Sequence, residues 1–152
     1  MFSKTTEYAL RATIYIAQKS SPEKKLGIDA IAKAIGSPRS FTAKILQLLT
    51  KDNVIISSTR GPNGGFYITD KAKKLPVSAI LEQTGGNDFF TKCVLGLKLC
   101  SEVKPCPLHY QYKPIKEQLI RLFEKKTIRD LANEIESGEA FINVLQKKSP
   151  AR

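Results

Sequence analysis

The sequence predicts a mainly α-helical protein with one small β-hairpin and a long helix near its C-terminal end. Three observations predict this fold class. Apolar residues recur with helical spacing in three segments of the first third of the chain. A glycine-rich stretch then separates two short β-branched or aromatic runs, which is the pattern of a hairpin. A strongly amphipathic segment follows the one stretch that contains every cysteine, and it predicts the long helix.

The composition indicates a globular chain with a large excess of positive charge. Its 152 residues are enough for one ordinary domain or two small ones, and 41% of them are hydrophobic. The net charge is +11, of which +8 falls before residue 77, where 13 basic residues outnumber 5 acidic ones. This balance favours a polyanionic partner, nucleic acid or an anionic membrane, on the first half of the chain. Neither a signal peptide nor an apolar run of about 20 residues is visible, so we expect a cytoplasmic protein.

The first predicted helix covers residues 5–20 and carries one apolar stripe along its length. A second helix is predicted from Ile28 to Ile35, with a narrow buried stripe at the i, i+3, i+4 and i+7 positions. Gly36 would end this helix, because glycine readily adopts the left-handed conformation that follows helix ends. The stripe of the first helix consists of Leu10, Ile14 and Ala17, with Ala9, Thr13 and Ile16 beside it.

A third helix is predicted directly after the second, with Ser37 as its N-cap and Pro38 at its first position. Two short helices joined by a tight turn that contains glycine are typical of a helix-turn-helix. The outward face of the third helix carries small, polar and cationic side chains, which suit a DNA major groove. An ordinary solvated helix face is the alternative. The residues expected to face inward are Phe41, Ile45, Leu48 and Leu49, and those expected to face outward are Arg39, Ser40, Ala43, Lys44 and Gln47.

A hairpin is predicted after the third helix, between strands at residues 54–58 and 66–68. Its tip, residues 59–65, contains three glycines and Arg60. Few side chains would keep this tip from a sugar–phosphate backbone, and Arg60 could enter a minor groove or bind a phosphate. A plain glycine-rich turn is the alternative. A helix-turn-helix followed by such a hairpin is the order of a winged helix, which predicts DNA binding.

A connector, a short helix and a long loop are predicted next. Residues 71–74 form a basic connector, and residues 76–83 form a helix that Gly85 and Gly86 end. Residues 86–112 show no clear periodicity. A loop of this length is usually functional or disordered, so it is the place to search for a site.

Two helices are predicted after the loop. Pro114 would open the first and longer of them, which runs to about Lys126. Thr127 and Asp130 resemble a capping box ahead of the second helix, which runs through Ile135. The long helix carries an apolar stripe that suits either the core or a copy of itself in a second subunit. This stripe consists of Ile115, Leu119, Leu122 and Phe123.

All three cysteines and the only histidine of the chain fall within one loop, with the spacing Cys-x6-Cys-x5-Cys-x2-His. An odd number of cysteines in a cytoplasmic protein argues against a disulfide framework and favours metal binding or redox sensing. Structural zinc sites usually pair cysteines about two to four residues apart, so the wider gaps favour a larger guest, an iron–sulfur cluster. Three unrelated core cysteines and a solvated loop histidine are the alternatives. The four candidate ligands are Cys93, Cys100, Cys106 and His109.

Four motifs, taken in order, give the chain a family resemblance. They are Glu7–Arg11 in the first helix, Leu46 and Leu49 in the third helix, Arg60–Phe66 in the hairpin, and the three-cysteine loop. The sequence resembles the Rrf2 family of bacterial transcription factors, the group that includes the iron–sulfur regulators IscR and NsrR. The resemblance extends over nearly the whole chain, from the N-terminus to about residue 135.

The resemblance implies a homodimer that binds a palindromic operator in double-stranded DNA, in the cytoplasm and at the bacterial nucleoid. It divides the chain into a winged helix-turn-helix domain (1–84), a cluster-binding loop (85–112), dimerisation helices (113–137) and a C-terminal tail (138–152). The third helix would enter the major groove and Arg60 the minor groove. The residues implied to contact DNA are Ser37, Pro38, Arg39, Ser40, Ala43, Lys44, Gln47, Arg60, Gly61 and Pro62.

The resemblance also implies that the three cysteines ligate an iron–sulfur cluster, [2Fe–2S] in preference to [4Fe–4S], which the apo form would lack. In related members the fourth ligand is a histidine just after the third cysteine or an acidic residue of the partner's first helix. Both candidates exist here, as His109 and as Glu7 of the partner subunit. The first gap is one residue longer than is typical of the family, which bears on the cluster type. The Cys-Pro-Leu-His ending favours His109.

These observations together predict a DNA-binding transcriptional regulator, in the first place a repressor, whose operator affinity follows the state of the cluster. The signal would be iron–sulfur supply, nitric oxide, peroxide or redox state. The alternative keeps the DNA-binding module but has the same cysteines sense zinc or thiol oxidation. An electron-transfer or metal-storage protein would leave the basic winged helix unexplained. With one histidine and no evident catalytic constellation, the chain is not expected to be an enzyme.

Overall fold

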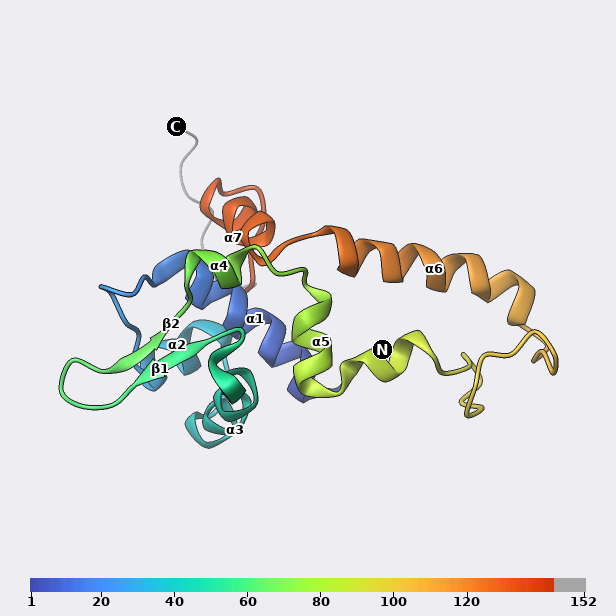
Figure 1. Ribbon diagram of the computed structural model, residues 1–152, viewed down its shortest axis with the longest axis horizontal. Coiled ribbons are helices and arrows are strands. Elements are labelled where there is room, and N and C mark those ends of the chain that lie inside the picture. Colours follow the sequence, from blue (N-terminus) through green and yellow to red (C-terminus); the bar gives the residue numbers. More distant parts are fainter. Residues whose placement is uncertain (144–152) are drawn as a thin grey trace.

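The computed structural model describes residues 1–143, which form a helical body and one long arm (Figure 1). Within these residues there are seven α-helices, two short 3-10 helices and one two-stranded antiparallel hairpin, which confirms the predicted fold class. The body consists of α1 to α5, the hairpin and α7, while α6 and the loop before it extend away from the body. No helix among residues 1–143 is both long and apolar enough to cross a lipid bilayer.

Helix α1 (Lys4–Lys19) is the centre of the body, because α2, α3, α5 and α7 all pack against it. Ala9 and Ala12 are completely buried, since their small side chains let the neighbouring helices approach closely. The predicted stripe is wrong for Leu10 and Ile14, which are only half-buried. The buried face of α1 instead follows Thr6, Ala9, Ala12, Thr13, Ile16 and Ala17.

Helices α2 (Ile28–Ile35) and α3 (Arg39–Leu49) form the predicted helix-turn-helix. Gly36 ends α2 with a left-handed φ of 67°, as predicted. The prediction of Ser37 as the N-cap of α3 is wrong, because Pro38 occupies the cap position. The Ser37 hydroxyl instead donates a hydrogen bond of 3.4 Å to the Pro38 carbonyl oxygen.

The inward face of α3 is confirmed for Ile45 and Leu49, which are fully buried, and wrong for Leu48, which is 37% exposed. Leu46 lies inward in its place and is only 1% exposed. Helix α3 packs on α1, α2 and α5 together, so its buried face is wider than one stripe and is turned toward Leu46. Phe41 lies at the edge of this face and is half-buried.

The hairpin consists of β1 (Ser57–Thr59) and β2 (Gly65–Tyr67), paired in antiparallel register. Strand β1 is shorter than predicted and begins three residues later. Strand β2 begins one residue earlier than predicted. The chain leaves α3 through the 3-10 helix η1 (Lys51–Asn53) and then buries Ile55 and Ile56 completely in the core before it joins the ladder. These two isoleucines therefore anchor the hairpin to the body.

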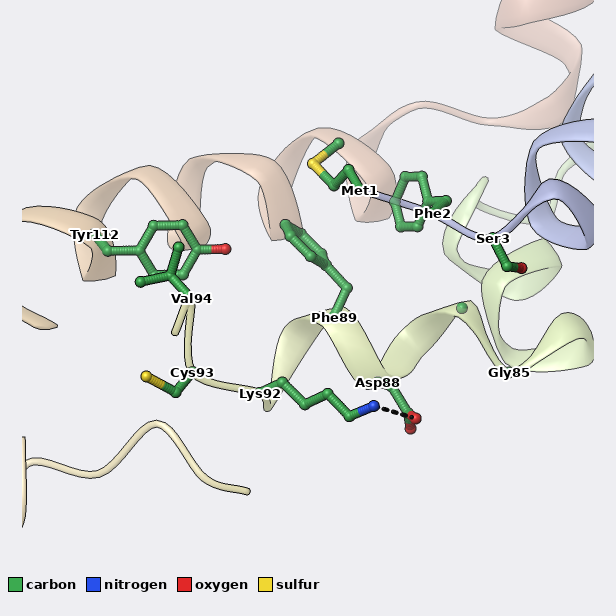
Figure 2. A pocket seen from close by; sticks show the side chains of 11 residues that line it. Met1, Phe2, Ser3, Gly85, Asp88, Phe89, Lys92, Cys93, Val94 and Tyr112 are labelled. Atoms are coloured by element: carbon green, nitrogen blue, oxygen red, sulfur yellow. Dashed lines mark ion pairs between the residues drawn. The ribbon is translucent and has the colours of Figure 1, made fainter. Parts of the chain in front are cut away.

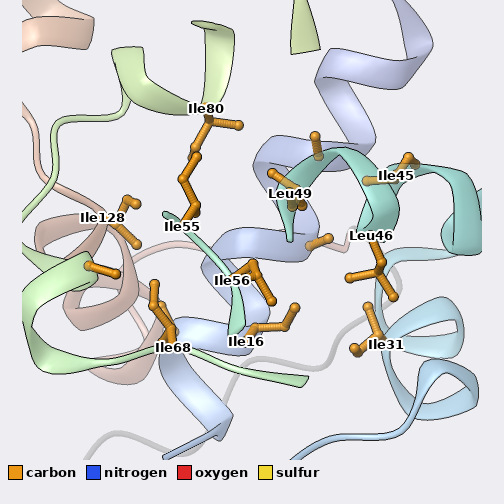
Figure 3. Close-up of a cluster of buried hydrophobic side chains, with 14 of the residues drawn as sticks. Ile16, Ile31, Ile45, Leu46, Leu49, Ile55, Ile56, Ile68, Ile80 and Ile128 are labelled. Atoms are coloured by element: carbon orange, nitrogen blue, oxygen red, sulfur yellow. The ribbon is translucent and has the colours of Figure 1, made fainter. Parts of the chain in front are cut away.

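The core lies between α1, α3, the base of the hairpin, α5 and α7 (Figure 3). Helix α5 (Ser78–Thr84) contributes Ile80 to this core, and α7 (Ile128–Glu136) contributes Ile128. Each large aliphatic side chain that leaves water contributes about 1.5–3 kcal/mol to stability. The body therefore holds together through its own contacts. The labelled core residues in Figure 3 are Ile16, Ile31, Ile45, Leu46, Leu49, Ile55, Ile56, Ile68, Ile80 and Ile128.

Local capping signals determine several helix ends. The predicted basic connector contains a short helix, α4 (Asp70–Lys73), which Thr69 caps by accepting a hydrogen bond from the Ala72 backbone N–H. Gly85 ends α5 with a φ of 75°, as predicted. The capping box of α7 is confirmed, because the Thr127 hydroxyl accepts from the Asp130 N–H and the Asp130 carboxylate accepts from the Thr127 N–H.

Helix α6 (His109–Lys125) begins earlier than predicted, because Pro114 lies inside the helix rather than at its start. Proline removes one helical hydrogen bond, here to the carbonyl oxygen of Tyr110. Tyr110 and Pro114 are both exposed, so water can reach that carbonyl group. The 3-10 helix η2 (Gly86–Phe90) shortens the predicted loop from its other end, to residues 91–108. Two apolar residues of the predicted tail, Val144 and Leu145, lie outside the described residues.

Candidate nucleic-acid interface and metal centre

The outward face of α3 is the first part of the candidate nucleic-acid interface. Among its residues Pro38, Arg39, Ser40, Lys44 and Gln47 are exposed, whereas Ala43 is half-buried and Ser37 is buried. The structure therefore brings all but Ser37 to an accessible face of one helix. Ser37 supports the turn between the two helices instead of presenting its hydroxyl to a ligand.

Arg39 is held by a carboxylate of the neighbouring helix. Its Nε donates to Oδ1 of Asp29 over 2.8 Å, and both side chains are exposed. Exposed ion pairs contribute only about 0–1 kcal/mol, so a phosphate group could replace this carboxylate at small cost. The pair also joins the start of α3 to α2 and orients the arginine across the turn.

The tip of the hairpin is the second part of this interface, and Figure 1 shows it projecting from the body. Arg60, Gly61 and Pro62 are all exposed there. A Cβ atom added to Gly64 would lie 2.3 Å from the Thr59 carbonyl oxygen, so the tight turn requires glycine at this position. The backbone of the tip therefore stays free of bulky side chains, which suits contact with a sugar–phosphate backbone.

The hairpin is fixed to the body by a third segment of backbone. Leu26 and Phe66 exchange two backbone hydrogen bonds of 2.8 Å each, which extends the ladder by one residue pair. Gly65 makes this possible, because a Cβ there would lie 2.7 Å from the Leu26 carbonyl oxygen. These hydrogen bonds therefore fix the position of the tip relative to α2 and α3.

The cysteine loop lies at the opposite end of the molecule, at the far end of the arm (Figure 1). All three cysteines are free thiols. Cys93 is buried, and Cys100 and Cys106 are half-buried. The candidate metal centre and the candidate nucleic-acid interface are therefore separate regions, joined by α5, η2 and α6.

His109 is the first residue of α6 and faces the loop. Its Nδ1 lies 3.3 Å from the sulfur of Cys100, and the residue is only 2% exposed. The alternative of a solvated loop histidine is therefore wrong. Within residues 1–143 its Nε2 is buried without a hydrogen-bond partner. An imidazole nitrogen in this state suits a metal, because buried polar atoms otherwise find a partner.

Cys93 and Cys106 form a second close pair. A backbone N–H of Leu95 donates to the Cys93 sulfur over 3.4 Å and lowers the pKa of the Cys93 thiol, and a hydrogen bond from Cys106 lowers it further. The same contact with Cys93, together with burial, raises the pKa of the Cys106 thiol. The two thiols therefore lie close enough to shift each other's pKa in opposite directions.

The four candidate ligands thus occur as two pairs, Cys93 with Cys106 and Cys100 with His109. Among residues 1–143, no three histidine, cysteine or acidic side chains converge closely enough to hold a metal ion. The chemistry of the donors nevertheless fits a thiolate-bound metal group, because three thiols lie in one loop and an imidazole without a partner on Nε2 begins the helix that follows it. Closure of the two pairs around one group would require movement of the loop.

Glu7, the other candidate for the fourth ligand, lies on α1 in the body. Its carboxylate pairs with the Lys4 ammonium at 3.4 Å. In the described part of a single chain no hydrogen bond joins Glu7 to a cysteine. A role for this residue toward a second copy of the chain remains a prediction.

A cavity of about 570 Å³ lies between the N-terminal residues, η2 and α6, and Cys93 borders it (Figure 2). The ring of Phe2 lies 5.5 Å from that of Phe89 and 5.4 Å from that of Phe123, between ring centroids. The segment that precedes α1 therefore contacts both the segment that leads into the cysteine loop and the helix that follows it. These residues are not among the predicted site residues, although the adjacent pair Phe89–Phe90 just before Cys93 is a signal in the sequence.

Sequence comparison places the chain among transcriptional regulators. The family described as Rrf2, iron-dependent transcriptional regulator, matches residues 2–134. A protein of Aquifex aeolicus that carries the name of an HTH-type transcriptional regulator is 34% identical over 143 residues, which are 93% of this chain and 96% of the relative. The HTH-type transcriptional regulator NsrR of Oceanobacillus iheyensis is 25% identical over 142 residues, which are 93% of this chain and 95% of the relative.

Comparison with solved structures shows that two other proteins share the fold of this chain. CymR, the global cysteine regulator of B. subtilis, superimposes with a TM-score of 0.68 at 17% identity, over 88% of this chain and 96% of CymR. IscR of T. potens superimposes with a TM-score of 0.67 at 16% identity, over 92% of this chain and 91% of that protein. All four similar proteins are named as regulators, and none is named as an enzyme, in agreement with the prediction from the sequence.

Proposed function

Because this chain belongs to the Rrf2 family of helix-turn-helix transcriptional regulators, we propose that it is a homodimeric repressor controlled by an iron–sulfur cluster in its cysteine loop. The observation that carries the proposal is the state of His109. This histidine is buried, contacts Cys100 at 3.3 Å, and has no hydrogen-bond partner on Nε2 among the described residues. A structural histidine would have its buried nitrogen satisfied.

The DNA-binding role is assigned to the exposed face of α3 and the tip of the hairpin. Lys44 and Gln47 would contact base edges or phosphates in the major groove. Arg60 would reach the adjacent minor groove or its phosphates. Support comes from their exposure and from the charge of +8 in residues 1–76, since basic side chains supply most of the affinity for the phosphate backbone.

Dimerisation is assigned to the outer face of α6. Leu108, Ile115 and Leu122 follow one another at seven-residue intervals and are 46%, 54% and 51% exposed. A row of apolar side chains exposed to water is typical of a surface that is buried against a partner. The seven-residue spacing is the repeat by which two helices pack together in a coiled coil. A second copy of α6 would supply that cover and give the two-fold symmetry that a palindromic operator requires.

The cluster is assigned to Cys93, Cys100 and Cys106, with His109 as the fourth ligand and a [2Fe–2S] group as the favoured type. Such a group supplies a redox-active centre that nitric oxide or oxidants can destroy. Substitution separates the two candidates for the fourth ligand. His109→Ala should change the visible spectrum of the reconstituted protein, and Glu7→Ala should not. The opposite result would assign the ligand to Glu7 of the partner subunit.

The path from loop to DNA-binding body is assigned to the start of α1. The Thr6 and Thr84 hydroxyl groups lie 3.1 Å apart, and a Cβ on Gly86 would lie 2.8 Å from the Thr6 side chain. Phe2 and Phe89 pack edge to face beside them. A change in the conformation of the loop would therefore displace the N-terminal end of α1. The helix-turn-helix packs against α1, so its position would change as well.

An absorption spectrum of protein purified under anaerobic conditions tests this function. A brown protein with visible bands is expected. A colourless protein with stoichiometric zinc would reject the cluster and favour the alternative, a regulator that senses zinc or thiol oxidation. Footprinting of the region upstream of the protein's own gene, with and without the cluster, would then locate the operator.

A further inference from the structure

One face of α6 is directed at the cysteine loop. His109, Lys113 and Lys116 occupy the i, i+4 and i+7 positions, which lie on the same side of a helix. His109 contacts Cys100 at 3.3 Å. Lys113 forms an ion pair with Glu102, which belongs to the loop. The third residue of this face, Lys116, is part of the same surface one turn further along the helix.

Lys116 is unusual among the lysines of residues 1–143. It is only 7% exposed, whereas lysine side chains almost always lie in water unless they are paired. Lys113 has the Glu102 carboxylate as its counter-charge. Within residues 1–143, the side chain of Lys116 forms no ion pair with a carboxylate and no hydrogen bond. The ammonium nitrogen still touches water, since His109 Nε2 is the one fully buried side-chain nitrogen or oxygen without a partner in residues 1–143. A cation with so little exposure and no carboxylate beside it is nevertheless stabilised by a neighbouring negative charge.

We propose that Lys116 is a positioning residue for the metal centre, and that its ammonium group is the counter-charge of the cysteine thiolates and of the group they bind. The proposal rests on the proposed function. Helix α6 would then hold the loop in two ways, by the imidazole of His109 at its start and by the positive charge of Lys116 two turns later.

The neighbourhood of Cys93 supports this assignment. The pKa of the Cys93 thiol is lowered by hydrogen bonds from Leu95, Cys106 and Leu97, and to the smallest extent by the charge of Lys116, which places that charge within electrostatic reach of the thiol. A cation beside a thiolate-bound cluster favours the reduced form, because that form carries one more negative charge. Lys98 lies in the same loop but is exposed, so water and salt screen its effect.

The midpoint potential of the cluster tests the proposal. The full-length protein would be reconstituted with iron and sulfide under anaerobic conditions and titrated against redox dyes while the visible spectrum is followed. Lys116→Met is expected to shift the potential to more negative values. Lys116→Arg is expected to restore the wild-type potential, because it keeps the charge. Lys98→Met is the matched control, since it removes the same charge from the exposed part of the loop, and it should leave the potential unchanged.

Each outcome of this titration is decisive. A Lys116→Met protein with the wild-type potential would overturn the proposal and leave the proposed function intact. If Lys116→Met takes up no cluster while its circular dichroism spectrum stays native, uptake by Lys116→Arg supports the proposal and failure of both variants overturns it. A wild-type protein that takes up no cluster rejects the proposed function and this inference with it.

Discussion

Ile16, Ile45 and Leu49 of the body are fully buried, whereas Ile115 and Leu122 of the arm are 54% and 51% exposed. The apolar side chains of the body are thus buried by contacts within one chain. The arm instead carries an exposed apolar row on one face and a buried lysine and a histidine on another. The body is therefore complete within one chain, whereas the arm has two faces without a partner in that chain, to which we assign the proposed second subunit and the proposed metal group.

Truncation of a core residue should produce the largest effect on stability. Ile16→Ala removes a fully buried side chain at the centre of the body and is expected to lower the free energy of unfolding by about 2–5 kcal/mol. Chemical denaturation followed by circular dichroism measures this loss. Val103→Ala at the end of the arm is the comparison variant, since Val103 is 89% exposed, and it should change the free energy of unfolding by less than about 0.5 kcal/mol. Equal losses at both positions would contradict the distinction between body and arm.

A charge on the exposed row of α6 should break the dimer and leave the body folded. Ile115→Lys is expected to shift the protein from dimer to monomer, because the ammonium group would lose its water in the apolar interface. Light scattering after size-exclusion chromatography measures the mass. Glu117→Gln is the matched control, since it changes the net charge by the same amount from an exposed position on α6, and it should stay dimeric. A dimer of Ile115→Lys would place the interface elsewhere.

Loss of a cation from the DNA-binding surface should weaken DNA binding and leave the arm unaffected. Arg60→Ala and Lys44→Ala are each expected to cost about 1–3 kcal/mol, or roughly a 5- to 150-fold loss of affinity. Binding to promoter fragments at several salt concentrations measures both the affinity and the salt slope, which should fall by about one. Lys98→Ala in the arm is the control. If Arg60→Ala and Lys44→Ala also bound every fragment like the wild type, the winged helix would not be the DNA-binding surface.

The smallest expected effect concerns the end of the arm, where α6 gives way to α7. Hydrogen bonds from the backbone N–H and the hydroxyl of Thr127 lower the pKa of the Asp130 carboxyl group below its ordinary value of 3.8. Its stabilising contribution is therefore present above pH 3.8 and is lost as the pH falls through the lowered folded value. Asp130→Asn should reduce this acid-dependent loss of stability in denaturation curves at pH 2–5. An unchanged pH dependence would show that the capping box does not contribute through its charge.

Features set by neighbours in sequence could be predicted from the sequence. Gly36 and Gly85 end helices through their own backbone conformation. Thr127 and Asp130 cap α7 through bonds that span three residues. The gathering of all cysteines and the histidine in one loop was equally visible, because it is a property of spacing alone.

Features set by tertiary packing could not be predicted in this way. Leu46 rather than Leu48 is buried because α3 meets three helices at once, and no periodicity within α3 reveals that. The start of α6 at His109 depends on contact with Cys100 across the loop, which overrides the signal of Pro114 as a first helical residue. The burial of Lys116, which is 7% exposed, could likewise not be predicted from its place in the sequence.

The most direct test of the account is the affinity of one purified protein for its operator, measured with the cluster bound and after its removal. The arm and the body are coupled in this account, so the two forms should differ in dissociation constant by about 5- to 150-fold. The same measurement on Cys100→Ala, which cannot complete the ligand set, should give the affinity of the cluster-free form under both conditions. Equal affinities of the wild-type protein with and without the cluster would contradict the claim that the loop at the end of the arm controls DNA binding by the body.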